Sequence, residues 1–328
     1  MTDSTKGFLA PAPAVLAGMC LAVAAHAQDA AKDFPAKPIR FVVAQSAGSQ
    51  SDSLARITAQ KMSENWGKPV VIDNRPGASG MLAASTVAKA APDGYTLLFT
   101  SATFAITAAL QPNLPFDPVK DFAGVAQVGY STGALVVAQS LGAKSVNELI
   151  ALAKVQPGKL VYASGGAGNI SHLNGEKFRL AADIKVVNVA FKSGADGIIE
   201  TLAGRTHYSF SGLAPALPFI ATGKLRALAV TTPQRAPQLP DVPALAETLP
   251  GFAHEGAFGL LAPAKTPAPV LNRISKEVAR ILNLPDVREK MLGMAFAPVP
   301  STPKEYDKSL RESIEGFSKL VLAIGLRK

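Results

Sequence analysis

Cysteine is almost absent from this sequence, and its scarcity excludes several kinds of chemistry. Of the 328 residues only Cys20 is a cysteine, and it lies within an N-terminal segment that we expect to be removed. The mature chain would then contain no thiol. This excludes disulfides, thiolate metal sites and cysteine catalysis.

Long hydrophobic runs are also absent beyond the N-terminus. Residues 1–27 combine Lys6, an apolar stretch from Phe8 to Ala25, and a small-x-small pattern that ends at Ala27. This combination is typical of a secretory signal cleaved near Ala27. No later apolar run reaches the roughly 20 residues that a membrane-spanning helix needs. The sequence therefore predicts an exported, periplasmic protein.

Basic residues outnumber acidic ones, but they do not gather into blocks. The formal net charge is +9, lysine and arginine are scattered singly, and aromatic residues make up 6% of the chain. Nucleic-acid binding proteins usually concentrate their positive charge, so we expect no nucleic-acid partner. A mild positive field does favour an anionic ligand.

Short β-branched runs alternate with longer helical patterns, which predicts parallel strands joined by crossover helices. The expected strands are Ile39–Ala44, Val70–Asp73, Tyr95–Thr100, Leu135–Ala138, Leu160–Ala163, Val186–Phe191, Tyr208–Phe210 and Leu225–Thr231. The expected helices are Ser51–Trp66, Ser79–Ala91, Val146–Val155, Ser171–Ala182, Ala195–Leu202, Val270–Leu282 and Pro303–Leu322. The chain length favours two doubly wound α/β domains over one continuous sheet.

We place the first crossing between the domains near residues 124–130, where glycines interrupt an extended stretch, and the second near residues 231–243. Residues 28–128 then form the first part of domain I, residues 129–230 form domain II, and residues 231–328 return to domain I. Sheets of this kind bind ligands beyond the carboxyl ends of their strands.

Three loops that follow expected strands consist mostly of glycine, alanine and serine. They comprise residues 45–52, 73–80 and 164–172. Such loops can direct several backbone N–H groups at one anion near the start of a helix. Ser51 or Asp52 is a candidate N-cap in the first loop, and Ser171 is one in the third. Arg75, in the second loop, could contact a ligand or pair with Asp73.

Motifs for catalysis, cofactors and metals are missing. There is no Gly-x-Ser-x-Gly, no His-Glu-x-x-His and no phosphate-binding Gly-Lys-Ser/Thr, and Gly166-x-Gly168-x-x-Ser171 lacks the third glycine of a dinucleotide site. His172 and Glu176 are one helical turn apart, but two residues make an incomplete metal site. We expect no metal and no cofactor, and a hydrogen bond between His172 and the glycine loop.

Several segments, taken in order, resemble the solute-binding proteins of tripartite tricarboxylate transporters, the Bug family. They are Phe34–Arg40, Pro69–Gly80, Ala91–Leu98, Gly223–Thr231 and Leu239–Pro243. The resemblance implies a periplasmic-binding-protein clamshell with a ligand cleft between its domains. It also implies a small organic carboxylate as ligand, held mainly by main-chain amides.

Carried over residue by residue, the resemblance gives a set of expected ligand-binding positions. They are Ala47, Gly48, Ser49, Asp52, Gly77, Ala78, Ser79, Gly80 and Ser101 in the first domain, and Ser164, Gly165, Gly168, His172, Lys192, Ser193 and Gly194 in the second. Gln45 and Ser49 depart from the family pattern and add hydrogen-bonding side chains. Ser211 replaces an acidic residue, which disfavours a ligand with an amine.

The principal hypothesis is a monomeric receptor that delivers its carboxylate to the large and small membrane subunits of a transporter. A periplasmic partner of a sensor kinase is an alternative that the sequence does not separate from transport. A hydrolase on an α/β scaffold is a third hypothesis, disfavoured by the missing motifs.

Overall fold

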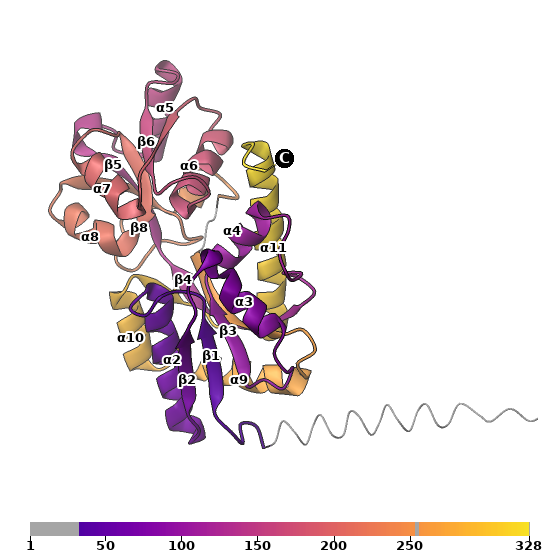
Figure 1. Cartoon of the computed structure of the whole chain (residues 1–328). Helices are drawn as coiled ribbons and strands as arrows, with labels where there is room; N and C mark the ends of the chain where they lie inside the picture. Colours follow the sequence, from indigo (N-terminus) through magenta and orange to yellow (C-terminus); the bar gives the residue numbers. More distant parts are fainter. Residues whose placement is uncertain (1–32, 253–255, 328) are drawn as a thin grey trace, which may run out of the picture.

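The computed structural model describes residues 33–252 and 256–327, which form two α/β lobes (Figure 1). The expected signal segment lies outside the described residues. The fold class is the expected one, because each lobe has a central sheet with helices on both faces. None of the helices in these two ranges is long and apolar enough to cross a membrane.

The first lobe is built on a sheet of six strands. Across the sheet they are β11 (Phe296–Pro298), β4 (Phe122–Ser131), β10 (Gly256–Pro263), β3 (Thr96–Thr100), β1 (Ile39–Val43) and β2 (Val70–Asn74). Its helices are α2 (Gln50–Trp66), α3 (Met81–Ala88), α4 (Thr103–Leu110), α9 (Ala268–Leu282), α10 (Pro285–Gly293) and α11 (Pro303–Ala323), with a 3-10 turn, η1, at Ala78–Gly80.

Strand β1 shows why this sheet is covered on both faces. Phe41 and Val43 pack with α2 and α9, whereas Val42 and Ala44 pack with α3 and α4. Successive side chains of a strand point to opposite faces, so a strand buried on both sides needs a continuous apolar run. That run is what the sequence presents at this position.

The second lobe is built on a sheet of five strands. Across the sheet they are β7 (Val187–Ala190), β6 (Val161–Ser164), β8 (Tyr208–Gly212), β5 (Gly133–Ala138) and β9 (Leu225–Val230). Its helices are α5 (Val146–Val155), α6 (Ile170–Ala181), α7 (Gly194–Leu202) and α8 (Leu213–Ala221), with 3-10 turns η2 (Gln139–Leu141) and η3 (Leu245–Glu247).

Both sheets are mixed, which corrects the expectation of parallel strands. Strand β10 is antiparallel to β3 and β4, and β5 is antiparallel to β8 and β9. The reason is the connection between the lobes. In the first lobe β4 carries the chain toward the second lobe and its neighbour β10 carries it back, so they run in opposite directions. In the second lobe β5 carries the chain away from the first lobe, whereas β8 and β9 run toward it.

The chain crosses between the lobes twice, first between β4 and β5 and again between Phe252 and β10. Strand β4 ends at Ser131 in the first sheet and β5 begins at Gly133 in the second, so the first crossing is at Thr132. Beside it the amide of Thr231 donates to the carbonyl oxygen of Gly133 at 2.9 Å. A Cβ on Gly133 would lie 2.6 Å from Thr231 Oγ1, so the start of β5 and the residue after β9 leave no room for a side chain there.

The crossings differ from the expected domain boundaries. The first lies at Thr132, beyond the expected end of the first part at residue 128, since β4 continues to Ser131. After β9 the chain stays with the second lobe, because Leu245 and Phe252 are buried in its core. The chain then returns to the first lobe through β10, and α9, α10 and α11 pack against the first sheet.

The expected strands and helices are present with shifts of a few residues at their ends, but six elements were missed: β4, β10, β11, α4, α8 and α10. Glycines in β4 and β10 explain two of these. A Cβ on Gly129 would lie 2.4 Å from the carbonyl oxygen of Ala297, and one on Gly259 would lie 2.4 Å from the Tyr306 hydroxyl. These glycines permit close approach of β11 and α11 and are not turn residues.

Candidate ligand cleft

Three loops of the first lobe meet at the carboxyl ends of neighbouring strands. They follow β1, β2 and β3, and they enclose a first-lobe recess of about 190 Å³. Its lining consists of Ala44, Gln45, Ser46, Pro76, Gly77, Ser79, Gly80, Thr100, Ser101 and Thr103. The recess therefore brings together residues from three separate segments of the chain.

Asp52 fixes the conformation of the first loop through hydrogen bonds to its carboxylate. Its carboxylate accepts hydrogen bonds from the Gly48 amide, Arg56 Nε and Asn74 Nδ2, all at 2.9 Å. Burial raises the pKa of Asp52, but these hydrogen bonds together lower it more, so the pKa lies below its usual value. Asp52 is 3% exposed and holds the loop; its carboxylate is occupied by protein donors.

Helix α2 begins at this loop, and its N-cap is Ser49. The Ser49 hydroxyl accepts from the Asp52 amide at 3.2 Å, which corrects the expectation of Ser51 or Asp52 as the cap. The amides of Gln50 and Ser51 lie in the first turn, where they have no partner within the helix. The start of α2 thus offers backbone donors and the positive end of its dipole.

The second loop has an unusual backbone. Four consecutive residues, Gly77, Ala78, Ser79 and Gly80, have φ angles of 128°, 45°, 54° and 87°. Left-handed conformations are costly for residues with a side chain and are concentrated at functional sites. Of the two roles expected for Arg75, the pairing with Asp73 is confirmed, because Arg75 Nε donates to Asp73 Oδ2 at 2.9 Å.

The loop after β6 forms the facing wall in the second lobe. Asn169 is the N-cap of α6 and accepts from the Ser171 amide at 3.0 Å, whereas Ser171 Oγ accepts from the Gly165 amide at 2.8 Å. Asn169, not Ser171, is therefore the cap. A Cβ on Gly165 would lie 2.8 Å from the Gly194 amide nitrogen, so the loops after β6 and β7 touch.

His172 supports the same loop. Its Nδ1 accepts from the Gly168 amide at 3.3 Å, which confirms the expected bond to the glycine loop. Burial lowers the pKa of His172, despite an opposing effect of Glu176. The neutral ring that results can accept from the amide, as a protonated ring could not. Within the described residues no cluster of three or more His, Cys, Asp or Glu side chains could hold a metal ion.

An interlobe cleft of about 440 Å³ lies between these loops. Its lining comes from both lobes and consists of Gln45, Gln50, Ser79, Ser101, Ala102, Thr103, Ile106, Thr107, Leu110, Ser131, Gly165, Ala167, Gly168, Asn169, Ile170 and Phe258. None of these lining residues is ionisable. Its volume is within the range of small-molecule sites, about 300–1,000 Å³.

Helices from both lobes begin at this cleft. Gln50 starts α2, Thr103 starts α4 and Asn169 caps α6, and all three residues line the cleft. Helix N-termini carry a partial positive charge and unpaired N–H groups. The cleft is therefore electropositive although no cationic side chain lines it.

A second-lobe recess of about 100 Å³ adjoins the cleft and shares Ser131, Asn169 and Ile170 with it. Ser211 lines this recess. Among the described residues the buried hydroxyls of Ser211 and Ser164 have no hydrogen-bond partner. Buried polar groups are normally paired, so a polar ligand group or water in this recess would satisfy Ser211.

The structure brings half of the expected positions to these three connected spaces. They are Gln45, Gly77, Ser79, Gly80, Ser101, Gly165, Gly168, Gly194 and Ser211. The others do not line them: Ala47, Gly48, Ser49, Asp52, Ala78, Ser164, His172, Lys192 and Ser193. Ser193, for example, caps α7 by accepting from the Asp196 amide at 3.2 Å, and Lys192 is exposed.

Several residues that line the cleft were not expected from the sequence. The polar ones include Gln50, Thr103 and Asn169, and the apolar ones include Ile106 and Leu110. Helix α4 was missed because six of its eight residues are buried and it has no polar face, so it lacks amphipathic periodicity. The Asn169-Ile-Ser sequence after a glycine loop was an available N-cap signal.

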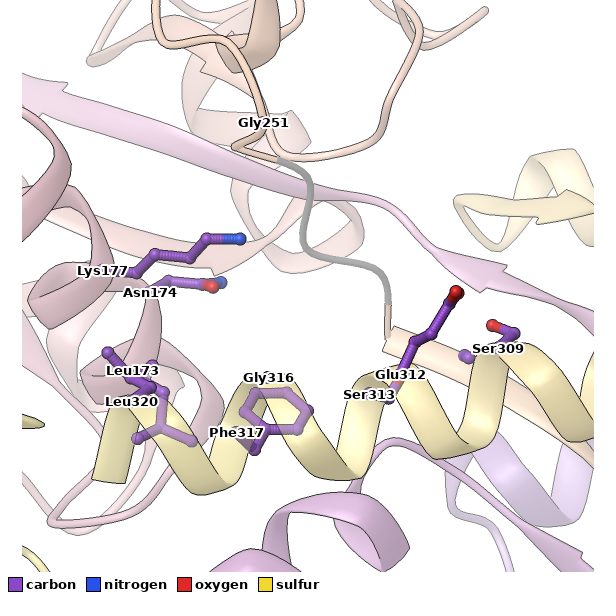
Figure 2. Close-up of a pocket in the computed structure, with 11 residues that line it drawn as sticks. Leu173, Asn174, Lys177, Gly251, Ser309, Glu312, Ser313, Gly316, Phe317 and Leu320 are labelled. Atoms are coloured by element: carbon purple, nitrogen blue, oxygen red, sulfur yellow. The ribbon is translucent and has the colours of Figure 1, made fainter. Parts of the chain in front are cut away.

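A cavity larger than the interlobe cleft lies elsewhere. It has a volume of about 670 Å³ and lies between α6 and α11, where Asn174 and Lys177 face Ser309 and Glu312 (Figure 2). Its lining comes from α6 and α11, together with Gly251 and Ala257, and includes neither the N-cap nor the first residue of a helix. For an anionic ligand, the interlobe cleft is the better site despite its smaller volume.

Comparison with known proteins agrees with this architecture. A family model described as tripartite tricarboxylate transporter family receptor matches residues 54–326. The chain is 34% identical to a UPF0065 protein of Bordetella bronchiseptica over 95% of this chain and 93% of that protein. It is 30% identical to the protein BugT of Bordetella pertussis over 94% of this chain and 96% of BugT.

Among solved structures, Rpa4515 from R. palustris with adipate is 30% identical to this chain. The two superpose with a TM-score of 0.72, over 89% of this chain and 99% of that one. The family is one of periplasmic solute-binding receptors and not a class of enzymes. The chain belongs to the tripartite tricarboxylate transporter receptor family, which includes the Bug proteins.

Proposed function

We propose that this protein is a periplasmic receptor that captures a small organic carboxylate between its lobes. The observation that carries this proposal is the neutral cleft at which α2, α4 and α6 begin. Helix N-termini from opposite lobes supply positive potential and amide donors to one space. An anion held there is stabilised by positive potential and hydrogen-bond donors from both lobes at once.

The lining chemistry favours a carboxylate over other ligands. Hydrogen bonds from neutral donors to a charged acceptor are roughly twice as strong as those between neutral groups. No aspartate or glutamate lines the cleft, so a ligand amine would find no counter-ion. With no acidic or basic side chain in the lining, proton transfer to a bound ester or amide has no evident agent, which favours binding over turnover.

Closure of the lobes would couple binding to transport. A ligand that contacts both lobes only in a closed state shifts the population toward that state. The two connections between the lobes meet the first sheet at the paired residues Ser131 and Gly256, so they supply a single hinge region. We propose that the closed monomer delivers its ligand to the large and small membrane subunits of a tripartite transporter.

Adipate provides a direct test, because it occupies the related structure Rpa4515. Protein freed of ligand by unfolding and refolding should be stabilised by adipate, by about 2.7 kcal/mol at 100 times its Kd. Adipamide and 1,6-hexanediol have similar lengths without the charge and should not stabilise it. The proposal fails if no member of a carboxylate panel shifts the melting temperature, or if the uncharged analogues act equally.

Delivery needs a separate measurement. Proteoliposomes that contain the large and small subunits should accumulate the labelled carboxylate only when the loaded receptor is added. Accumulation without the receptor, or none with it, would refute the transport role while leaving carboxylate binding intact.

A further inference from the structure

Three side chains form a hydrogen-bonded chain between the first-lobe recess and the interlobe cleft. Gln45 Nε2 donates to Ser101 Oγ at 3.1 Å, and Ser101 Oγ donates to Thr103 Oγ1 at 3.2 Å. All three residues line both spaces. They come from the loop after β1, the loop after β3 and the first residue of α4.

The direction of these hydrogen bonds determines what the chain offers to a ligand. Ser101 Oγ also accepts from the Thr103 amide at 3.4 Å, so its single hydrogen is directed to Thr103 Oγ1. Thr103 then retains one hydroxyl hydrogen to donate. Gln45 retains its Oε1 as an acceptor, since no described residue donates a hydrogen bond to it.

The backbone of Gln45 is held in place, which makes the side chain a defined feature of the site. Its carbonyl oxygen accepts from Asn74 Nδ2 at 3.0 Å, and Asn74 Nδ2 also donates to Asp52. The site thus presents a donor at Thr103 and an acceptor at Gln45, joined through Ser101. A carboxylate without a hydroxyl group can accept from Thr103. It has no hydrogen to donate to Gln45 Oε1, so that acceptor stays unpaired.

We propose that Gln45 makes this site selective for carboxylates that carry a hydroxyl group near the carboxyl group. The carboxylate accepts from Thr103 and from loop amides, and the neighbouring hydroxyl donates to Gln45 Oε1. This inference rests on the proposed carboxylate-binding function and specifies the ligand class. A site that pairs with a ligand hydroxyl disfavours the analogue without it, because the protein acceptor is left unpaired.

Calorimetric titration with two matched pairs tests this selectivity. Lactate and propionate differ only by a hydroxyl, as do malate and succinate. The hydroxylated member of at least one pair should bind wild-type protein about tenfold more tightly, which corresponds to about 1.4 kcal/mol for one acceptor left unpaired by the other member. Equal binding of both members of each pair would overturn the inference.

Single substitutions test whether Gln45 is responsible for the preference for hydroxylated carboxylates. Gln45→Leu should weaken the hydroxylated ligand to the level of its partner and leave the partner unchanged. Gln50→Leu, at a second glutamine of the cleft outside the hydrogen-bonded chain, should keep the preference. Thr103→Val should weaken both members of a pair equally. Unchanged melting temperatures show that the variants are folded.

The outcomes separate this inference from the proposed function. If Gln45→Leu weakens both members of a pair by the same factor, Gln45 serves the carboxylate itself and the selectivity proposal is wrong. If wild-type protein binds no carboxylate of any kind, the proposed function is wrong and the selectivity falls with it. Binding of adipate without any hydroxyl preference would leave the receptor function standing and refute only this inference.

Discussion

Gly168 of the second lobe and Leu110 of the first lie against each other across the cleft. A Cβ on Gly168 would be 2.8 Å from Leu110 Cδ1, closer than real Cβ atoms approach. Gly168 also has a φ of 74°, a conformation that favours glycine. This contact joins the loop after β6 to the C-terminal end of α4. The distance between the lobes at this point therefore depends on the absence of a side chain at Gly168.

Gly168→Ala should therefore weaken ligand binding, by about tenfold if Leu110 cannot move aside (~1.4 kcal/mol). Gly158→Ala is the matched control, since Gly158 has a φ of 76° and nothing within 4 Å of a Cβ. Both should lose about 1–2 kcal/mol of stability from the left-handed backbone. Titration and denaturant unfolding measure the two effects. Equal affinities of the two variants would show that the contact does not limit closure.

Ser49→Glu should weaken carboxylate binding and preserve the fold, because it places a negative charge next to Gln50, at the start of the helix that faces the cleft. Loss of the Ser49 N-cap hydrogen bond itself should lower the free energy of unfolding by about 1 kcal/mol. Ser145→Glu provides the comparison. Ser145 caps α5 with the same geometry, accepting from the Glu148 amide at 3.2 Å, as Ser49 does from Asp52. Ser145→Glu should bind normally, and unchanged affinity of Ser49→Glu would place the anion elsewhere.

His172 should make the protein less stable in mild acid. Burial lowers the pKa of the folded-state ring below its usual 6.5, so the unfolded chain takes up a proton first as the pH falls. The free energy of unfolding should be constant above about pH 6.5 and decline below it, by at most about 1.4 kcal/mol per pH unit. Denaturant titrations from about pH 8 to about pH 5 bracket this range and measure the decline.

His172→Asn should flatten that pH dependence, since its side-chain oxygen can accept from the Gly168 amide without titrating. His207→Asn is the control. His207 Nδ1 accepts from the Val161 amide at 2.9 Å, away from the cleft. A decline that persists in His172→Asn would assign the acid sensitivity to another group.

Two further glycines should respond oppositely to the same substitution. Gly259→Ala places a Cβ 2.4 Å from the Tyr306 ring and hydroxyl and 2.8 Å from the Ala126 carbonyl oxygen. It should destabilise the first lobe by about 1–3 kcal/mol or more, as overpacking does. Gly316→Ala, in exposed helix α11 with nothing within 4 Å, should stabilise by about 0.5–1 kcal/mol. Thermal unfolding of both variants measures whether stability falls in Gly259→Ala and rises in Gly316→Ala.

Local chemistry makes the strand-end loops recognisable in the amino-acid sequence. Gly77 and Gly80 have positive φ, and Gly165 packs against the neighbouring loop, so glycine is required at each of these positions for a physical reason. The sequence predicted an interruption at Gly129, where β4 continues, and it did not predict β10, which contains Gly259. In both cases the reason for glycine lies in an element remote in sequence, which a local pattern cannot reveal.

The amino-acid order determined the two α/β lobes and the small-residue loops, because periodicity and backbone freedom are properties of short segments. Only the packed molecule decided that α4 lines the cleft, and that Gln45 donates to Ser101, which in turn donates to Thr103. Gln45 and Ser101 are 56 positions apart and meet through the register of β1 and β3. Register is set by the burial of whole faces, and no single segment contains it.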